Sequence, residues 1–328
     1  MGGGSRQTYA ATLPPDRFYC LLDELPLHLI PRHAASLLHA RDEHPLFLNP
    51  DCAICSDGQL PDELAAHRDL LSGFALQGTI AWVGQPEEQN PIPFWLGPQM
   101  EDVVRELRPG EPAPSNLSGD LRSLLSAAGI LISETTALDR PQRGDMLHRS
   151  GSLFRQKGYA PLTGLIHPFH VAALRRYYRY WIRSGAVPLG DGQSLRRYAV
   201  YNDSVARFFH RQITATLSAV AGEPLKPSYV YMASYLSGAE LKKHVDRAQC
   251  EFSVTLCLDF SPEPELATPW PIHLDTSAGT VTVYQALGDG LAYRGTRLPH
   301  YRSKLDDGRT STSIFFHYVA ADFTGSLD

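Results

Sequence analysis

Apolar residues recur at two different spacings along the chain, and the change falls near residue 222. Before it, they repeat every three or four positions, which is the spacing of one helix face. After it, β-branched and aromatic residues gather in short runs separated by turn residues, which is typical of strands. The first pattern predicts short helices within 14–48 and longer ones at 61–76, 100–107, 171–185 and 203–221, with a helix that ends in a strand at 117–132.

The second pattern predicts that the C-terminal half is built from strands. Runs suited to strands occupy 228–235, 251–258, 272–274, 280–284, 290–293 and 311–319, and two more are expected earlier, at 79–83 and 94–96. Two helices followed by a series of short strands favour an α+β fold. In that fold a double-stranded β-helix, or jelly roll, is backed by helices.

A polar stretch rich in arginine and glycine, 134–160, is typical of a connection between domains. We therefore expect a boundary near residue 145. It would separate a mixed, mainly helical region at 1–145, serving as a lid or in substrate recognition, from a catalytic domain at 146–328. The pattern that ends in 117–132 is similar to the winged-helix modules that bind leader peptides in peptide-tailoring enzymes. An ordinary helical cap is the alternative.

The expected helix at 171–185 is both basic and aromatic. Helical spacing places Leu174, Tyr177, Tyr178 and Trp181 on one stripe, so the arginines between them are expected to form a solvated face. Two histidines, at 167 and 170, come just before this helix with a proline between them. They are expected to mark the helix entry rather than to bind a metal.

Composition narrows the class of protein. The chain has 328 residues, of which 43% are hydrophobic and 20% charged, which is ordinary for a globular protein. A formal net charge of −5 gives no electrostatic reason to expect nucleic acid as a partner. No apolar run is long enough to span a bilayer, and residues 1–5 do not resemble a secretory signal, so no membrane partner and a cytoplasmic location are expected.

The cysteines also favour a reducing compartment. There are five, an odd number, which does not suggest a disulfide framework. Cys52 and Cys55 form a CxxC, which can be half of a zinc site. No second CxxC is present, so two packed or partly exposed thiols are expected instead.

A candidate metal centre lies in the strand-rich half. His244 and Asp246 are two residues apart in a strand-like run, so their side chains are expected on the same face. His300 would supply a third ligand from a distant strand, while His210, His273 and His317 are alternatives to it. Two histidines and one carboxylate suit non-haem Fe(II) and leave coordination positions open for chemistry.

Four short motifs now carry a family resemblance. Residues 235–246, from Tyr235 to Asp246, resemble the YxxGxxLxxHxD segment of Fe(II)/2-oxoglutarate-dependent oxygenases, in particular the prolyl-hydroxylase-like branch. Residues 288–293 are similar to that family's GD-x-L-x-F strand, and His300 stands where the second histidine is expected. Arg309 and Ser311 match the RxS that follows. The resemblance covers roughly residues 200–320.

The resemblance implies a function and a set of ligands. His244, Asp246 and His300 would hold Fe(II), with 2-oxoglutarate and O2 as cosubstrates and ascorbate in support. The reaction would convert 2-oxoglutarate to succinate and CO2 while an unactivated C–H bond of a peptidyl, amino-acid or natural-product substrate is hydroxylated. A non-catalytic jelly-roll module that binds a metal or ligand, and a cupin-type metal enzyme that does not use 2-oxoglutarate, are the alternatives.

Arg309 is the residue that the resemblance assigns to the distal carboxylate of 2-oxoglutarate. Arginine suits this task because its planar, charged fork binds a carboxylate in a bidentate way. A hairpin turn at 305–308 would place it about four residues from His300 along the sheet, ~13 Å at ~3.3 Å per residue. Ser311 would point the same way. The chain departs from the family at Cys257, where many relatives have a tyrosine, and Thr255, Tyr235 or Tyr293 could compensate.

Overall fold

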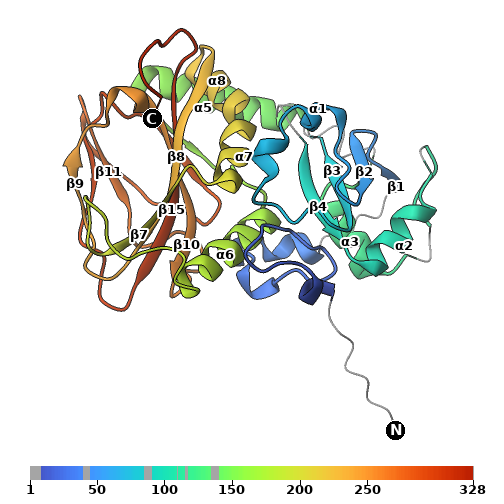
Figure 1. The fold of residues 1–328 in the computed structure, drawn as a ribbon. Coiled ribbons are helices and arrows are strands. Elements are labelled where there is room, and N and C mark those ends of the chain that lie inside the picture. The colour runs from blue at the N-terminus through green and yellow to red at the C-terminus, as the bar shows by residue number, and fades with distance from the viewer. Residues whose placement is uncertain are drawn as a thin grey trace.

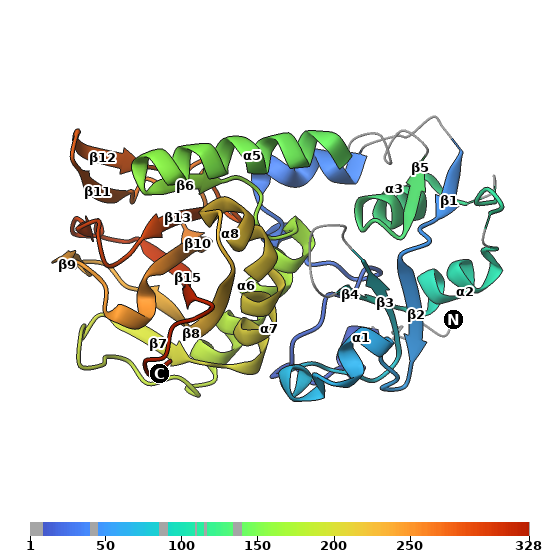
Figure 2. The same cartoon turned by 90° about the horizontal axis from the view of Figure 1, so that it is seen from above.

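The computed structural model describes residues 9–39, 45–84, 91–108, 110–114, 117–133 and 140–327. The N-terminal elements lie at one end of the molecule and two large sheets at the other, with helices between them (Figure 1). Helix α5 (Arg140–Lys157) extends from the sheets toward the N-terminal elements and runs through residue 145, where the domain boundary was expected (Figure 2). Helices and antiparallel strands together agree with the expected α+β class.

The N-terminal region is mixed, and among its described residues short helical elements outnumber strands, as expected. An antiparallel sheet joins β2 (Cys52–Ser56), β3 (Thr79–Val83) and β4 (Ile92–Leu96), and β1 (Leu46–Leu48) pairs with β5 (Leu131–Ser133). The helical elements around them are short: η1 (Tyr9–Thr12), η2 (Leu27–Leu29), η3 (Arg32–His39), α1 (Asp62–Ala65), η4 (Arg68–Leu71), α2 (Pro98–Glu106) and α3 (Gly119–Ala127). Cys52 and Cys55 are free, partly buried thiols, as expected.

The helix expected over 61–76 is largely absent. Only α1 and the single 3-10 turn η4 form there. The following residues pair instead with Phe18. Its N–H donates to the Gly73 carbonyl at 2.8 Å, and its carbonyl accepts from the Ala75 N–H at 3.0 Å. Because these backbone groups are already bonded to another segment, they cannot complete a helical ladder. Tertiary pairing therefore overrides the local apolar spacing.

The long helix expected over 203–221 is broken in two, α7 (Ser204–Gln212) and α8 (Thr214–Ala221), at Ile213. Asp203 caps the first, accepting from the N–H groups of residues 205 and 206. Gly222, at φ +80°, ends the second in the left-handed conformation that glycine adopts readily. Within the described ranges, none of the helices has the length and apolar character needed to cross a bilayer.

Helix α6 (Pro168–Arg183) begins three residues before the predicted start, so His167 is its N-cap, as expected of a residue at the helix entry, while His170 lies in its first turn. The expectation that its arginines form a solvated face was wrong. Arg175 is 2% exposed, and its guanidinium contacts Asp259 at 2.9 Å and Glu263 at 2.7 Å. Arg179 binds the same Asp259 at 2.6 Å. Helical spacing predicts which residues share a face of the helix. It does not predict that Asp259 and Glu263, which are distant in the sequence, cover the basic face.

Two antiparallel sheets face each other in the C-terminal part. The larger has the order β6-β13-β10-β15-β8-β7 and the smaller the order β12-β11-β14-β9. Their strands are β6 (Tyr159–Leu162), β7 (Arg197–Tyr201), β8 (Leu225–Tyr235), β9 (Leu241–His244), β10 (Phe252–Ser261), β11 (Ile272–Thr276), β12 (Gly279–Val283), β13 (Gly290–Arg294), β14 (His300–Arg302) and β15 (Thr310–Ala320). The sequence pattern missed the short strands β6 and β7, whereas His244 and His300 lie in strands, as expected.

The larger sheet has one face toward the helices and one toward the smaller sheet. On β15, the Tyr318 hydroxyl donates to the His210 carbonyl of α7 at 2.7 Å, so this side of the strand faces the helices. His317 points the other way and contacts Ser253 of β10 at 2.9 Å. Alternation along the strand then places Ser311, like His317, on the face between the sheets. The candidate site is built on this inner face.

Replacing Asp259 by alanine is expected to lower the free energy of unfolding by about 3 kcal/mol. The substitution leaves the buried Arg175 without one of its two acidic partners, and breaking a buried pair costs far more than breaking an exposed one. Urea denaturation followed by circular dichroism would measure the change. Glu101→Ala, which breaks the exposed pair with Arg105, is the control and should cost ~0.5 kcal/mol or less. Equal losses for the two variants would contradict the interpretation.

Candidate metal centre

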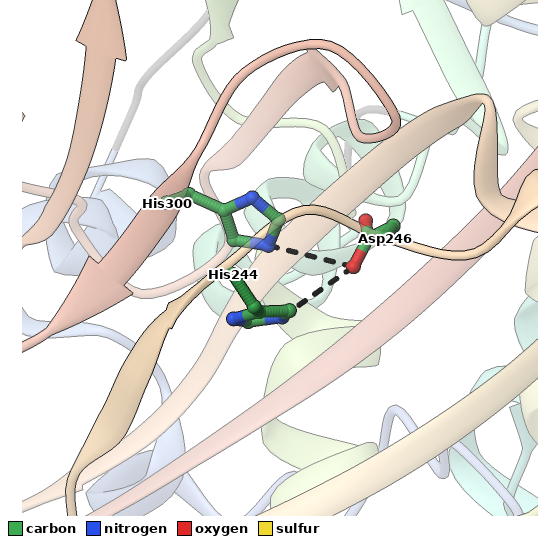
Figure 3. Close-up of side chains that lie close together, drawn as sticks. All are labelled: His244, Asp246 and His300. Carbon is green, nitrogen blue, oxygen red and sulfur yellow. Dashed lines mark ion pairs between the residues drawn. The ribbon is translucent and has the colours of Figure 1, made fainter.

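His244, Asp246 and His300 converge on one point between the two sheets (Figure 3). Strands β9 and β14 pair antiparallel with His300 directly opposite His244, and their ring centroids are 4.3 Å apart. Nε2 of each histidine lies 3.5 Å from Oδ1 of Asp246. One ligand atom from each of the three residues lies within 4.8 Å of the other two, so a single metal ion could reach all of them.

Strand alternation does not place Asp246, contrary to the sequence argument. Strand β9 ends at His244. Asp246 instead follows the strand, and its N–H donates to the Gly295 carbonyl at 2.9 Å. A Cβ on Gly295 would lie 2.3 Å from Asp246 Oδ2, so only glycine allows the carboxylate this position. His244 and Asp246 are neighbours, as the same-face expectation predicted. The contact with Gly295, and not strand alternation, gives Asp246 its position.

Both histidines are oriented through their second ring nitrogen. Nδ1 of His244 lies 2.7 Å from the Lys242 carbonyl, and Nδ1 of His300 lies 2.9 Å from the Leu298 carbonyl. A carbonyl only accepts, so Nδ1 must carry the proton and donate in each case. Each Nε2 is then left with a lone pair directed at the common point. This is the tautomer that a metal ligand requires.

Electrostatics within the site favour a cation. Burial opposes ionisation of Asp246, but when His244 and His300 are protonated, hydrogen bonds from their Nε2–H groups hold the pKa of its carboxyl well below the usual range. The hydrogen bond to Asp246 in turn raises the pKa of His244, against the effect of partial burial. Asp246 therefore carries a negative charge at neutral pH.

A chain of hydrogen bonds fixes which oxygen of Asp246 faces the histidines. The Ser253 hydroxyl donates to Asp246 Oδ2 at 2.8 Å, leaving Oδ1 for the metal position. Since this hydroxyl has one proton, His317 must donate to it from Nδ1, at 2.9 Å. Burial lowers the pKa of His317 to about 4, so the ring is neutral at physiological pH. His317, an alternative ligand in the sequence analysis, orients the carboxylate through Ser253 instead.

Three of the residues expected to contact the cosubstrate are buried on the larger sheet. Tyr235 and Ser311 lie opposite each other on β8 and β15, and both are buried, as is Thr255 on β10. The Tyr235 hydroxyl and Thr255 Oγ1 are buried without a hydrogen bond of normal geometry to any described residue. Buried polar atoms are nearly always satisfied, so these two atoms indicate the position of a polar ligand.

Arg309 comes just before β15, two residues from Ser311, so alternation puts it on the same face. Its side chain is 34% exposed, and its Nε is 3.5 Å from Asp306 Oδ2. The sequence analysis missed a different cation, Arg302, which is 5% exposed and belongs to β14 together with His300. The signal for it was present, because a residue two positions beyond a ligand on a strand shares its face. Cys257, where the family pattern has tyrosine, is also buried here, and burial raises the pKa of its thiol to about 12.

No protein-family model and no curated protein matches this sequence. Several solved structures are similar to the chain. One is the non-haem alpha ketoglutarate dependent epimerase SnoN from nogalamycin biosynthesis, with 16% identity, a TM-score of 0.46, and 54% of this chain and 84% of that chain covered. Another is a prolyl-4-hydroxylase from Pseudomonas putida, with 17% identity, a TM-score of 0.44, and 53% and 99% covered.

A third similar structure is HygX from Streptomyces hygroscopicus, solved with nickel, 2-oxoglutarate and hygromycin B, with 13% identity, a TM-score of 0.42, and 54% of this chain and 88% of that chain covered.

The Ser253→Ala variant is expected to bind Fe(II) or Co(II) about 10- to 100-fold more weakly than the wild type. Without the hydroxyl, Asp246 loses the bond that directs Oδ1 toward the histidines. Metal titration followed by calorimetry would measure the change. Ser234→Ala is the matched control, since its hydroxyl accepts from Thr312 on the opposite face of the same sheet. Equal affinities for the two variants would show that Ser253 does not orient the ligand.

Proposed function

We propose that this protein is an Fe(II)/2-oxoglutarate-dependent oxygenase whose two C-terminal sheets form a double-stranded β-helix. The observation that carries the proposal is the convergence of the His244 and His300 Nε2 atoms on Asp246 Oδ1. Each histidine is held in the metal-binding tautomer by a backbone carbonyl. Two neutral nitrogens and one carboxylate oxygen form the facial set that suits Fe(II) and leaves positions open for other ligands.

The inner face of the sheets also suits the cosubstrate. 2-Oxoglutarate is a polar molecule with a carboxylate at each end, and the buried Thr255 Oγ1 and Arg302 Nε have no hydrogen-bond partner among the described residues. Hydrophobic and aromatic side chains share this face: Ile272 and Leu274 of β11 and Tyr293 of β13 are buried there. Polar atoms in need of a ligand, surrounded by side chains that exclude water, are the arrangement expected of such a site.

When bound, Fe(II), 2-oxoglutarate and O2 would supply the oxidising chemistry that attacks an unactivated C–H bond and releases succinate and CO2. The chain's own part is to hold and shield these groups. Asp246 and the two histidines fix the metal, while Ser253 fixes the carboxylate. Ascorbate would support turnover by keeping the iron reduced.

The substrate is proposed to be a small natural product, an amino acid or a peptide, with hydroxylation as the outcome. The N-terminal elements, residues 1–145, are proposed to recognise it or to cover the site as a lid. A cupin-type enzyme that does not use 2-oxoglutarate would need the same metal ligands. It would give no role to the buried cation Arg302 beside them, and for this reason the oxygenase is favoured.

Purified protein given Fe(II), 2-oxoglutarate and ascorbate in air is expected to produce succinate, and the His244→Ala variant is expected to fall to the rate seen without Fe(II). Losing one of three protein ligands removes the basis of metal binding. Succinate can be quantified by mass spectrometry. Addition of a metal chelator should stop production in the wild type.

His273→Ala is the matched control. His273 lies on β11 of the same small sheet and bonds Thr282 Oγ1 at 3.0 Å, away from the metal ligands. Its variant should keep the wild-type rate. A His244→Ala protein that produced succinate as fast as the wild type would overturn the proposed function.

A further inference from the structure

Aromatic side chains stand in a row on the inner face of the larger sheet. Tyr201 of β7, Tyr231 of β8 and Phe315 of β15 lie directly opposite one another in the strand register. Phe315 is four residues beyond Ser311, so the row shares the inner face with it. Neighbouring ring centroids are 5.1 and 4.7 Å apart, with interplanar angles of 22° and 14°. These spacings match the ~4.8 Å between strands, so the rings stand upright with their edges toward the smaller sheet.

The row lies beside the hydrogen-bond chain that holds Asp246. The Tyr231 ring is 5.8 Å from the ring of His317, a member of that chain, and the Tyr229 ring is 4.7 Å from it. The exposed fraction rises outward, from 3% at His317 and 8% at Tyr229 to 50% at Tyr201. We call Tyr201, Tyr229 and Tyr231 the tyrosine wall. It leads from the candidate metal centre to β7, the open edge of the larger sheet.

An exposed cation borders the tyrosine wall. Arg247 directly follows Asp246, and its guanidinium donates to the Tyr229 hydroxyl at 3.0 Å, with Cζ 5.4 Å from the ring centroid. Among the residues that the structure describes, no carboxylate lies within ion-pair distance of this guanidinium. Lys243, whose side chain points to the other face of β9, is by contrast paired with Asp275 at 2.6 Å. The tyrosine wall therefore ends beside a positive charge that no described acid balances.

These features indicate the chemistry of a ligand. The edges of aromatic rings carry partial positive charge, and the flat face of another aromatic ring packs well against them. A guanidinium binds a carboxylate or phosphate group in a planar, bidentate way. Cross-strand stacking alone would explain the row of rings. It would not explain an unbalanced arginine bonded to that row, in a chain whose formal net charge is −5.

We propose that the tyrosine wall and Arg247 bind the substrate, and that the substrate is a planar aromatic compound with a carboxylate or another anionic group. This assignment rests on the proposed function and deepens it, because it names the class of compound held beside the metal. The aromatic ring would lie along Tyr231 and Tyr201, with its anionic group on Arg247. Tyr229 is a positioning residue, since its hydroxyl accepts from that guanidinium.

The test compares three ligands that share one carbon skeleton. They are 2-naphthoate, 2-naphthalenemethanol, which has no charge, and decahydro-2-naphthoate, which has no aromatic ring. Calorimetry on the full-length protein loaded with Ni(II) and 2-oxoglutarate would measure their affinities. The wild type is expected to bind 2-naphthoate about fivefold more tightly than either of the others. This is the size of effect that one exposed ion pair or one set of aromatic contacts typically gives.

Two variants should remove the two preferences separately, which a general loss of structure would not do. Arg247→Gln is expected to bind 2-naphthoate and its alcohol with equal affinity, and to keep the preference for the aromatic over the saturated acid. Tyr231→Leu is expected to lose the preference for the aromatic ring and to keep the preference for the charged ligand. Tyr201→Leu, at the exposed edge of the sheet, replaces the second variant if that protein does not fold.

Lys243 and Tyr301 provide the matched control. They stand next to His244 on β9 and His300 on β14, so alternation turns both side chains to the outer face of the smaller sheet. Lys243 Nζ lies 4.8 Å from the Tyr301 ring centroid, which again places a cation against a tyrosine. Lys243→Gln and Tyr301→Leu should keep both preferences.

The remaining outcomes separate the substrate class from the proposed function. A wild type that binds Ni(II) and 2-oxoglutarate but shows no preference among the three ligands, or binds none of them, would overturn the substrate class while the proposed function stands. Preferences that survive in Arg247→Gln and in the tyrosine variants, or that are lost in the control variants, would do the same. A protein that binds Ni(II) but not 2-oxoglutarate would overturn the proposed function, and the substrate class with it.

Discussion

The pairing of β9 with β14 is the constraint on which the site depends. These strands are short, four and three residues, yet their register places His244 opposite His300. Opposed residues in an antiparallel pair lie ~5 Å apart, so the register alone brings two imidazoles within reach of one ion. A slip by one residue would turn one ring to the other face. Strand β11 limits such a slip because it pairs with the other edge of β14.

The third ligand depends on a different kind of support. Asp246 lies outside the strand, and neither alternation nor register positions it. Its backbone bonds to Gly295, and its carboxylate is held by Ser253, which His317 holds in turn. The site therefore combines two residues from paired strands with one from a loop, and the loop residue depends on the surrounding hydrogen bonds for its position.

The sequence predicted the parts of this site that depend on residue type and spacing. It singled out His244, Asp246 and His300, which the structure brings together, and it placed Tyr235 and Ser311 in strands that turn out to be paired neighbours. It could not predict the Ser253–His317 chain, because those contacts join strands whose pairing no local pattern encodes. Nor did it indicate that Arg302 is buried. A motif reports residue type and order, whereas burial can be seen only when the chain is folded.

Charge balance provides a reason for the two buried charges near the metal site. A divalent cation bound by Asp246 leaves one positive charge, and Arg302 adds a second. The dianion 2-oxoglutarate cancels both, so the loaded site would be neutral overall although every charge in it is buried. Isolated charges in a low-dielectric interior are costly, whereas a complete neutral set is tolerated. Either ligand bound alone would leave a net charge. The metal and the diacid should therefore bind cooperatively.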